Sequence, residues 1–391
     1  MRLLFAVVLM NFSLLAAPAR AVEMNNLYDA AVAVAEQSDE ARAKGEYQAL
    51  QEVLIRVSGN REVNNNALVK AQLARAGEFV VQFGYAQAAS GQQLTLRFDP
   101  ARVDRLLRQA NEPVWGLRRP LVLLWWVDER NGSRQLMGES TAAEQWQQLS
   151  AAAVRRGLPL MLPLMDLDDS MAVASADLWG QFMAPVLTAS ARYQPDLVVV
   201  AKSYAAGGNQ QLEWQLYPAA AAPTAPAQAS GSLSFNGLAP LPLVDALADK
   251  LAATYAVRAS ADSGGESLLL TVSELVDVSD LVAAQQRLVA LNAVSRVELV
   301  GLQGKRAQFR LYLLGTVEDV ERGLSLDHHF LLPPAAGATP PAAAGAEPSA
   351  TGSISLVSPE PVNTTEAAVA PTPTVQADAA VTDGLLRRWQ R

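Results

Sequence analysis

Residues 22–112 carry the hydrophobic periodicities of a small α+β domain. Ser38 can cap a helix that ends at Gly59, because apolar residues follow at alternating steps of four and three: Ala43, Tyr47, Leu50, Leu54 and Val57. Alternation with a period of two then predicts two strands, over residues 79–85 and 94–98. Asp99-Pro100 begins a short second helix. The predicted order is strand, helix, strand, strand, helix.

Residues 113–260 predict a layered α/β domain. The run from Leu121 to Val127 is continuously apolar, which is typical of a strand buried on both faces, so Trp125 and Trp126 should point to opposite sides. The run is too short to cross a bilayer, which takes about 20 residues. Strands and helices alternate after it: a helix with a Thr141–Glu144 capping box, a strand at 158–164, a helix over 177–193 interrupted at Pro185, strands from Leu197 and at 229–235, and a helix from Pro242.

Residues 265–332 repeat the order of the first domain. A strand beginning at Ser267 precedes a helix with Leu281, Ala284 and Leu288 on one face, and two strands and a helix capped by Thr316 follow. A diverged internal duplication and a common small α+β arrangement both explain the coincidence. The absence of repeated residue identities favours the common arrangement.

The segment 333–391 is predicted to be a disordered tail. Most of it is Ala, Pro, Thr, Ser and Gly, which supply too little large apolar surface to form a core. Its end differs, because it combines apolar and basic side chains: Leu385, Leu386, Arg387, Arg388, Trp389 and Arg391. A frayed terminus is one interpretation. The other is a short docking peptide for an acidic partner or a lipid surface.

The first 21 residues predict a secretory signal peptide. Arg2 precedes an apolar stretch, and Ala19-Arg20-Ala21 forms a small-x-small cleavage site, so Val22 would begin the mature chain. An uncleaved anchor is the alternative, although the stretch is short and is interrupted by Asn11 and Ser13. The pattern predicts an exported, soluble periplasmic protein with no transmembrane span after cleavage.

Composition narrows the classes of chemistry. The chain contains no cysteine, which excludes disulfides, thiolate metal sites and cysteine nucleophiles. The formal charge is -8, and it becomes -10 without Arg2 and Arg20, so nucleic acid is not an expected partner. The only histidines, His328 and His329, are adjacent and would point apart, so we expect no metal site there and no cofactor.

The acidic loop that follows the 158–164 strand is the candidate ligand site. Asp166, Asp168, Ser170 and Asp177 occupy positions one, three, five and twelve of a possible calcium loop, but Met171 stands where the turn requires glycine. Acidic loops at strand ends also line ligand clefts, so we retain Asp166, Asp168 and Asp169 as candidate ligand-binding residues. A solvated loop is the simpler interpretation.

Several segments in the same order resemble a proteobacterial secreted family known only as a domain of unknown function. They are "EQSDEARAKGEYQALQEVLIRVSGN", "LTLRFDPARVDRLLRQA", "PVWGLRRPLVLLWW", "RRGLPLMLPLMDLDD" and "ASARYQPDLVVVAKSY", and the resemblance covers about residues 23–260. It implies a periplasmic or envelope location and supplies no catalytic residues.

The sequence therefore predicts a non-catalytic envelope protein that binds an unidentified protein partner in an assembly or scaffold role. The alternative is a module that binds a glycan or small molecule in the middle domain, where tryptophans are concentrated. A hydrolase that uses carboxylates alone is a third class, but no carboxylate pair can be chosen from spacing. Exposed tryptophans beside Asp166 would favour the ligand hypothesis, and an exposed apolar face on the first or third domain would favour the partner hypothesis.

Overall fold

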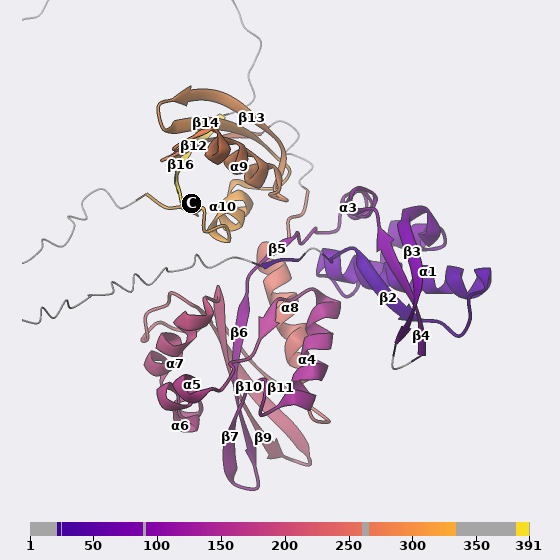
Figure 1. Cartoon of the computed structure of the whole chain (residues 1–391), viewed down its shortest axis with the longest axis vertical. Helices are drawn as coiled ribbons and strands as arrows, with labels where there is room; N and C mark the ends of the chain where they lie inside the picture. Colours follow the sequence, from indigo (N-terminus) through magenta and orange to yellow (C-terminus); the bar gives the residue numbers. More distant parts are fainter. Residues whose placement is uncertain (1–21, 25, 89–90, 260–265, 334–380, 391) are drawn as a thin grey trace, which may run out of the picture.

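The computed structural model describes residues 22–24, 26–88, 91–259, 266–333 and 381–390, which form three α+β units (Figure 1). The predicted signal peptide, most of the predicted tail (residues 334–380) and Arg391 lie outside the described residues. Among the described helices, none combines the length and the apolar character that a membrane crossing requires. The chain is a mixed α+β protein, as its hydrophobic pattern predicts.

The N-terminal unit contains the predicted strand, helix, strand, strand, helix order. Strands β2 (Asp29–Ala33), β4 (Gly91–Phe98) and β3 (Val80–Ala88) form an antiparallel sheet in that spatial order. Helix α1 (Asp39–Ser58) packs on one face of the sheet, and the short α2 (Ala67–Leu73) and α3 (Pro100–Gln109) complete the core. Both predicted caps of α1 are present. Ser38 accepts a hydrogen bond from Ala41 N, and Gly59 ends the helix in the left-handed region.

The middle unit is a three-layer α/β domain. Its central strand β6 (Val122–Arg130) pairs in parallel with β9 (Leu197–Ala206) and with the two-residue β8 (Leu160–Met161). Strands β7 (Ser133–Met137), β10 (Asn209–Pro218) and β11 (Ala229–Phe235) extend the sheet in the order β11-β10-β9-β6-β7. One face packs against α4 (Ala143–Arg156) and α8 (Leu241–Tyr255). The other packs against α5 (Leu167–Ala172), α6 (Ser175–Gly180) and α7 (Met183–Ser190).

Three local predictions for the middle unit are wrong in detail. Helix α4 has no Thr141–Glu144 capping box, because the Thr141 hydroxyl accepts instead from Gly138 N at 2.9 Å. The predicted 177–193 helix is interrupted at Gln181, which is left-handed, whereas Pro185 lies in the first turn of α7, where a missing N–H costs nothing. The predicted 158–164 strand is only two residues long. Pro159 and Pro163 lie on either side of these residues and have no backbone N–H to donate to the sheet.

The third unit has the same strand order as the first. Strands β12 (Ser267–Ser273), β14 (Arg306–Leu313) and β13 (Val294–Gln303) are antiparallel neighbours in that order, and α9 (Val278–Val289) and α10 (Val317–Ser325) pack on one face. Thr316 and Asp319 form the capping box of α10. The first and third units therefore share a βαββα core in which the first and second strands flank the third, in the orders β2-β4-β3 and β12-β14-β13.

The prediction that the tail is disordered through residue 391 is wrong at its end. Residues 381–389 form strand β16, which pairs in parallel with β12 and antiparallel with the short β15 (Phe330–Leu331). The third unit therefore has a five-stranded sheet, with the order β13-β14-β12-β16-β15. Burial alternates along the last residues as it does in a strand. Arg387 and Trp389 are buried, whereas Leu386 is exposed and Arg388 is half-buried.

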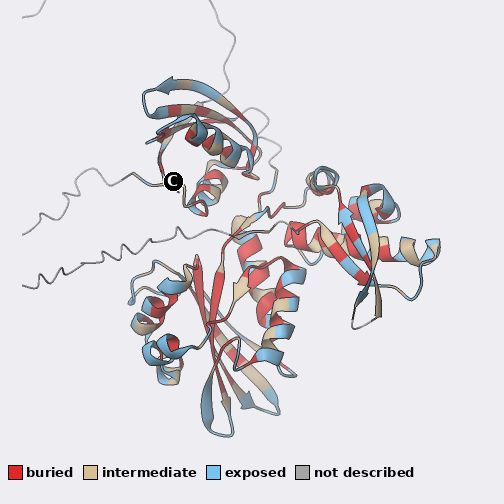
Figure 2. Cartoon of the chain, viewed as in Figure 1, coloured by how far each residue is buried: buried red, intermediate tan, exposed pale blue. Residues whose placement is uncertain are grey.

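The three units meet at a short two-stranded ribbon (Figure 1). Strand β1 (Val22–Glu23) pairs with β5 (Arg118–Arg119), the segment that leads from the first unit into the second. Gly59, at the end of α1, is in close contact with α8, since a Cβ added to it would lie 2.2 Å from that of Ala252. Figure 2 shows buried residues that continue through this junction from the N-terminal unit into the middle unit.

Candidate functional site

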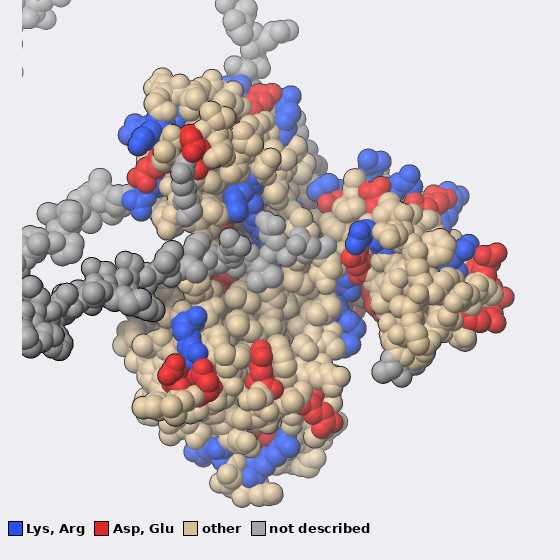
Figure 3. Space-filling view, in the orientation of Figure 1, with Lys and Arg blue, Asp and Glu red and all other residues tan. Residues whose placement is uncertain are grey.

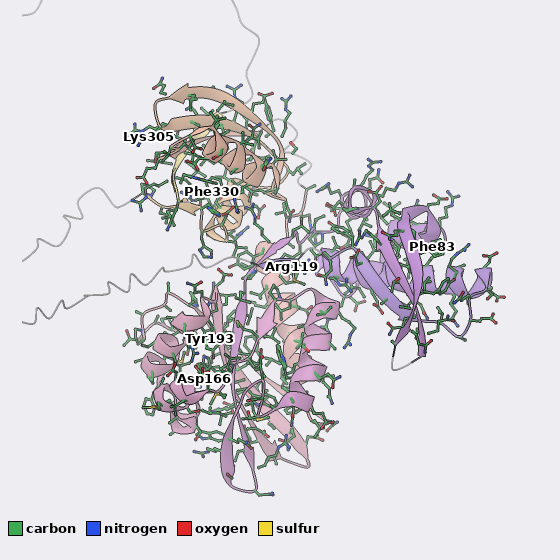
Figure 4. All side chains as sticks on the ribbon, viewed as in Figure 1. Phe83, Arg119, Asp166, Tyr193, Lys305 and Phe330 are labelled. Atoms are coloured by element: carbon green, nitrogen blue, oxygen red, sulfur yellow. The ribbon has the colours of Figure 1, made fainter. Side chains whose placement is uncertain are left out.

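The acidic loop that the sequence singles out is an ion-paired clamp. Asp166 begins α5 and accepts a hydrogen bond from Asp169 N at 3.0 Å. The Arg192 guanidinium donates to both carboxylate oxygens of Asp166, at 2.8 and 2.7 Å, and to Asp169 at 3.0 Å. The buried Asp169 also accepts from the hydroxyl of Tyr193 and from Met165 N. Figure 4 shows Asp166 and Tyr193 on the same side of the middle unit.

The electrostatics of this clamp follow from its pairing. The hydrogen bonds from Arg192 lower the pKa of Asp166 to about 2, and burial together with the bond to Asp169 raises the pKa of Tyr193 to about 12. Asp168 is the exception, because its side chain is 85 % exposed and lies 3.9 Å from Arg192. Arg192 thus pairs with two of the three candidate acids, and ligand binding by this loop stays a prediction.

The calcium-loop spacing does not converge on one point. Asp166 caps α5, whereas Asp177 accepts a hydrogen bond from Ala174 N at the start of α6. The Ser170 hydroxyl donates to the backbone carbonyl of Asp166. Within the described ranges, no group of three or more histidine, aspartate or glutamate side chains is placed to hold a metal ion.

The tryptophans are core residues in this structure. Trp126 packs in the core beneath α4 and α8, and Trp125 packs in the core beneath α5 to α7, on opposite faces of the sheet as predicted. Their indole N–H groups donate to Ser203 and Ser190, at 2.7 and 2.9 Å. Five of the seven tryptophans are buried, and Trp146 and Trp179 are half-buried against the two cores of the middle unit.

The junction of the first two units is built around Arg119, which the sequence analysis did not identify. Its guanidinium is fully buried and donates five hydrogen bonds, all to backbone carbonyls: Trp115, Gly116, Arg56, Arg156 and Gly157. The Arg56 carbonyl lies near the end of α1 and the Arg156 carbonyl at the end of α4. A cation placed on two helix C-termini complements both helix dipoles. Figure 4 shows Arg119 where the units meet.

The two histidines diverge, as predicted, but each makes a contact. His328 Nε2 lies 3.3 Å from a carboxylate oxygen of Asp196 in the middle unit, and that contact raises the pKa of His328. His329 stacks on Trp389 with 5.1 Å between the ring centroids, and its Nδ1 lies 2.6 Å from the carbonyl of Gln390. Adjacent residues thus join the third unit to the middle unit and to the C-terminal strand.

The candidate docking residues 385–389 lie against the third unit of their own chain. Trp389 is 5 % exposed and meets Phe330 edge-on at 5.4 Å between centroids. The carbonyl of Arg387 accepts from the Ser273 hydroxyl, and Gln390 N donates to the His329 carbonyl at 3.0 Å. Burial lowers the pKa of Arg387, which lies near Glu321 of α10. Arg391 lies outside the described residues.

An exposed apolar surface follows the opposite edge of the third unit. It consists of side chains on α9, on the loop that precedes α9, and on the edge strand β13. Helix α9 and strand β13 pack against each other. We call it the apolar rim, and its members are 43 to 73 % exposed: Val276, Val278, Val282, Leu299 and Leu302. Leu299 and Leu302 pair with the buried Phe309 and Ala307, so they continue the core face of the sheet past the cover of α9.

The comparisons with known proteins cover the N-terminal unit. Residues 21–116 match a family model described as a domain of unknown function (DUF8605). The match spans β1 to α3 and includes Trp115 and Gly116, whose carbonyls accept from Arg119. No curated protein matches the chain. The chain therefore carries a domain of unknown function at its N-terminus.

Proposed function

We propose that this chain is a non-catalytic, exported protein of the bacterial envelope that binds a protein partner through the apolar rim of its third unit. The observation that carries the proposal is the exposure of Val278 and Val282 on α9 and of Leu299 on the edge strand β13, which packs against that helix. Monomeric proteins rarely leave a contiguous apolar surface uncovered unless another molecule covers it.

The chemistry of the rim defines the partner. Among the described strands, β13 is an edge of the five-stranded sheet, so its outward backbone groups can pair with an added strand. The apolar side chains beside that edge would contact alternate side chains of the added segment. The partner is thus a protein that lays an extended, apolar segment along β13 and against α9.

The remaining features agree with a binding role. On the face seen in Figure 3, acidic and basic side chains are interspersed, without the large basic area that a nucleic-acid surface shows. The signal-like residues 1–21 support export. In the cluster of titratable groups around Asp166, both Asp166 and Asp169 already have Arg192 as a hydrogen-bond partner. These observations favour the partner hypothesis over a ligand site.

The test is affinity capture from bacterial envelope extract with matched variants. Val278→Glu combined with Val282→Glu places two charges on the rim, while Leu167→Glu combined with Met171→Glu places two on exposed positions of α5 in the middle unit. The proposal expects one protein that the native chain and the α5 variant enrich and the rim variant loses. Equal capture by the rim variant, or capture by none, would rule out the rim as the binding surface.

A further inference from the structure

The position of β16 in the third unit corresponds to an empty edge in the first. In both βαββα modules the first strand, β2 or β12, pairs with the third strand, β4 or β14, on the side away from the second strand. The N-terminal module closes its core with no further strand among the described residues on the β2 edge, whereas β16 adds to the β12 edge of the third unit. The N-terminal module therefore shows that a βαββα core can close without a strand in the position of β16.

The connection to β16 is much longer than closure requires. Strands β15 and β16 are antiparallel neighbours, and neighbours of this kind can be joined by a turn of about two residues. The chain instead places residues 332–380 between them. Because the free energy of loop closure changes slowly with length, the extra residues cost little, and the connection is long enough for β16 to leave the β12 edge while it stays attached to the chain.

The strand also makes an imperfect fit. Trp389 is buried between His329 and Phe330, yet its indole Nε1 has no hydrogen-bond partner in the described part of the chain. The guanidinium of Arg387 is buried with the backbone carbonyl of its neighbour Leu386 as its hydrogen-bond acceptor. An unpaired buried donor costs about 1–3 kcal/mol. A segment that pairs these groups would therefore fit the position of β16 better than β16 itself does.

We propose that the cleft between β12 and β15 is a second binding site, for an extended peptide segment of a partner protein, and that β16 occupies it as an internal competitor. The segment it accepts runs parallel to β12, with an aromatic side chain between His329 and Phe330 and a long, basic side chain two residues earlier beneath α10. The site lies at the far side of the sheet from the apolar rim, and it does not depend on the rim binding a partner.

The internal strand sets the affinity that a partner must exceed. A tethered ligand acts at an effective concentration of about 1 mM or below, so a free peptide of equal affinity competes poorly while the chain is intact. Cutting the tether lowers the effective concentration of β16 and favours the added peptide. A peptide that pairs the buried groups better than β16 does is favoured as well. The cleft is therefore closed at rest and open to a better-fitting segment.

The experiment uses the full chain with a specific protease site inserted within residues 345–365. After cleavage, the C-terminal fragment is held only by the contacts of β16, and a fluorescent peptide of residues 381–391 is added while its anisotropy is measured. We expect the cut protein to bind the peptide and the uncut protein to bind it at least 30-fold more weakly. A Trp389→Ala peptide should compete at least 30-fold less well than the native peptide, and a Leu386→Ala peptide should compete equally, because Leu386 is 44 % exposed.

Three results would overturn the proposal. In the first, the cut fragment does not exchange with the peptide over days, which makes β16 an integral strand. In the second, a chain ending at Leu332 loses hydrogen-exchange protection in β12 and β14, and added peptide fails to restore it. In the third, the intact protein dimerises by exchanging β16, which makes a second copy the occupant. Rim variants leave all of these readouts unchanged, so failure here is distinct from failure of the proposed function.

Discussion

Arg119 donates a 2.8 Å hydrogen bond to the backbone carbonyl of Arg56, joining the start of the middle unit to the end of α1. Four further carbonyls accept from the same guanidinium, and Arg56 itself donates to the carbonyl of Arg155 at 3.2 Å. The two units therefore share one buried network of arginine N–H groups and helix-terminal carbonyls. Because the acceptors are backbone carbonyls, this network fixes the relative orientation of the two units independently of their surface side chains.

Replacing Arg119 should destabilise both units together. Arg119→Met retains most of the packing volume but leaves five buried carbonyls without their donor, and we expect the free energy of unfolding to fall by at least about 3 kcal/mol. Urea unfolding followed by fluorescence should also change from one transition to two, because the units lose their shared network. Arg75→Met, at an exposed position, is the control and should stay within about 0.5 kcal/mol of the native protein. An unchanged midpoint for Arg119→Met would contradict the structural role.

The Arg192–Asp166 pair predicts a pH dependence at acid pH. The folded pKa of Asp166, about 2, lies below its unfolded value of about 3.9. Stability from the pair is therefore fully present above the unfolded pKa and is lost as the pH falls toward 2. The difference in unfolding midpoint between the native chain and Arg192→Gln should be constant above pH 5 and shrink between pH 4 and 2. A difference that stays constant down to pH 2 would show that the pair does not form in solution.

His328 predicts the opposite dependence near neutral pH. Its contact with Asp196 raises its pKa above the ordinary value of 6.5, so the contact stabilises the junction below that pH and is lost as the pH rises through the folded pKa. The chain has two histidines, so their ring signals can be titrated individually by NMR. We expect Asp196→Asn to lower the pKa of His328, because the substitution removes the carboxylate that faces it. If the pKa of His328 is the same in both proteins, the contact is absent.

Local sequence signals predicted the elements better than the site. Ser38 and Thr316 cap helices with their side chains, and Gly59 ends a helix in the left-handed region. Each of these roles depends on neighbouring residues, so the sequence was enough to predict it. The capping interpretation of Thr141 failed because its hydroxyl accepts from Gly138 N, three residues earlier, and not from the helix that follows. The Ser38 hydroxyl, by contrast, accepts from Ala41 N within the helix and donates to Glu36.

Long-range pairing escaped the sequence analysis for a physical reason. Asp166 and Asp169 read as a solvated acidic loop, because their partner Arg192 lies beyond two intervening helices. Arg119 lies in a basic pair, a pattern that is typical of a surface position. Its hydrogen-bond acceptors are backbone carbonyls, which occur at every residue and therefore give no signal in the sequence. The alternation of Arg387 and Trp389 was the available signal for β16, and composition of the preceding tail concealed it.

The last prediction concerns how β16 is held in the intact protein. Trp389→Ala removes the largest buried side chain of the strand, and substitutions of this kind cost about 3–5 kcal/mol. If that cost falls on docking of the strand, the amides of residues 385–389 should exchange with solvent at least ~100-fold faster, while those of β14 keep their native rates. Leu386→Ala, on the exposed side of the same strand, should change neither. Equal acceleration in β14 and β16 would show that the strand and the module unfold as one, and would exclude an independently released β16.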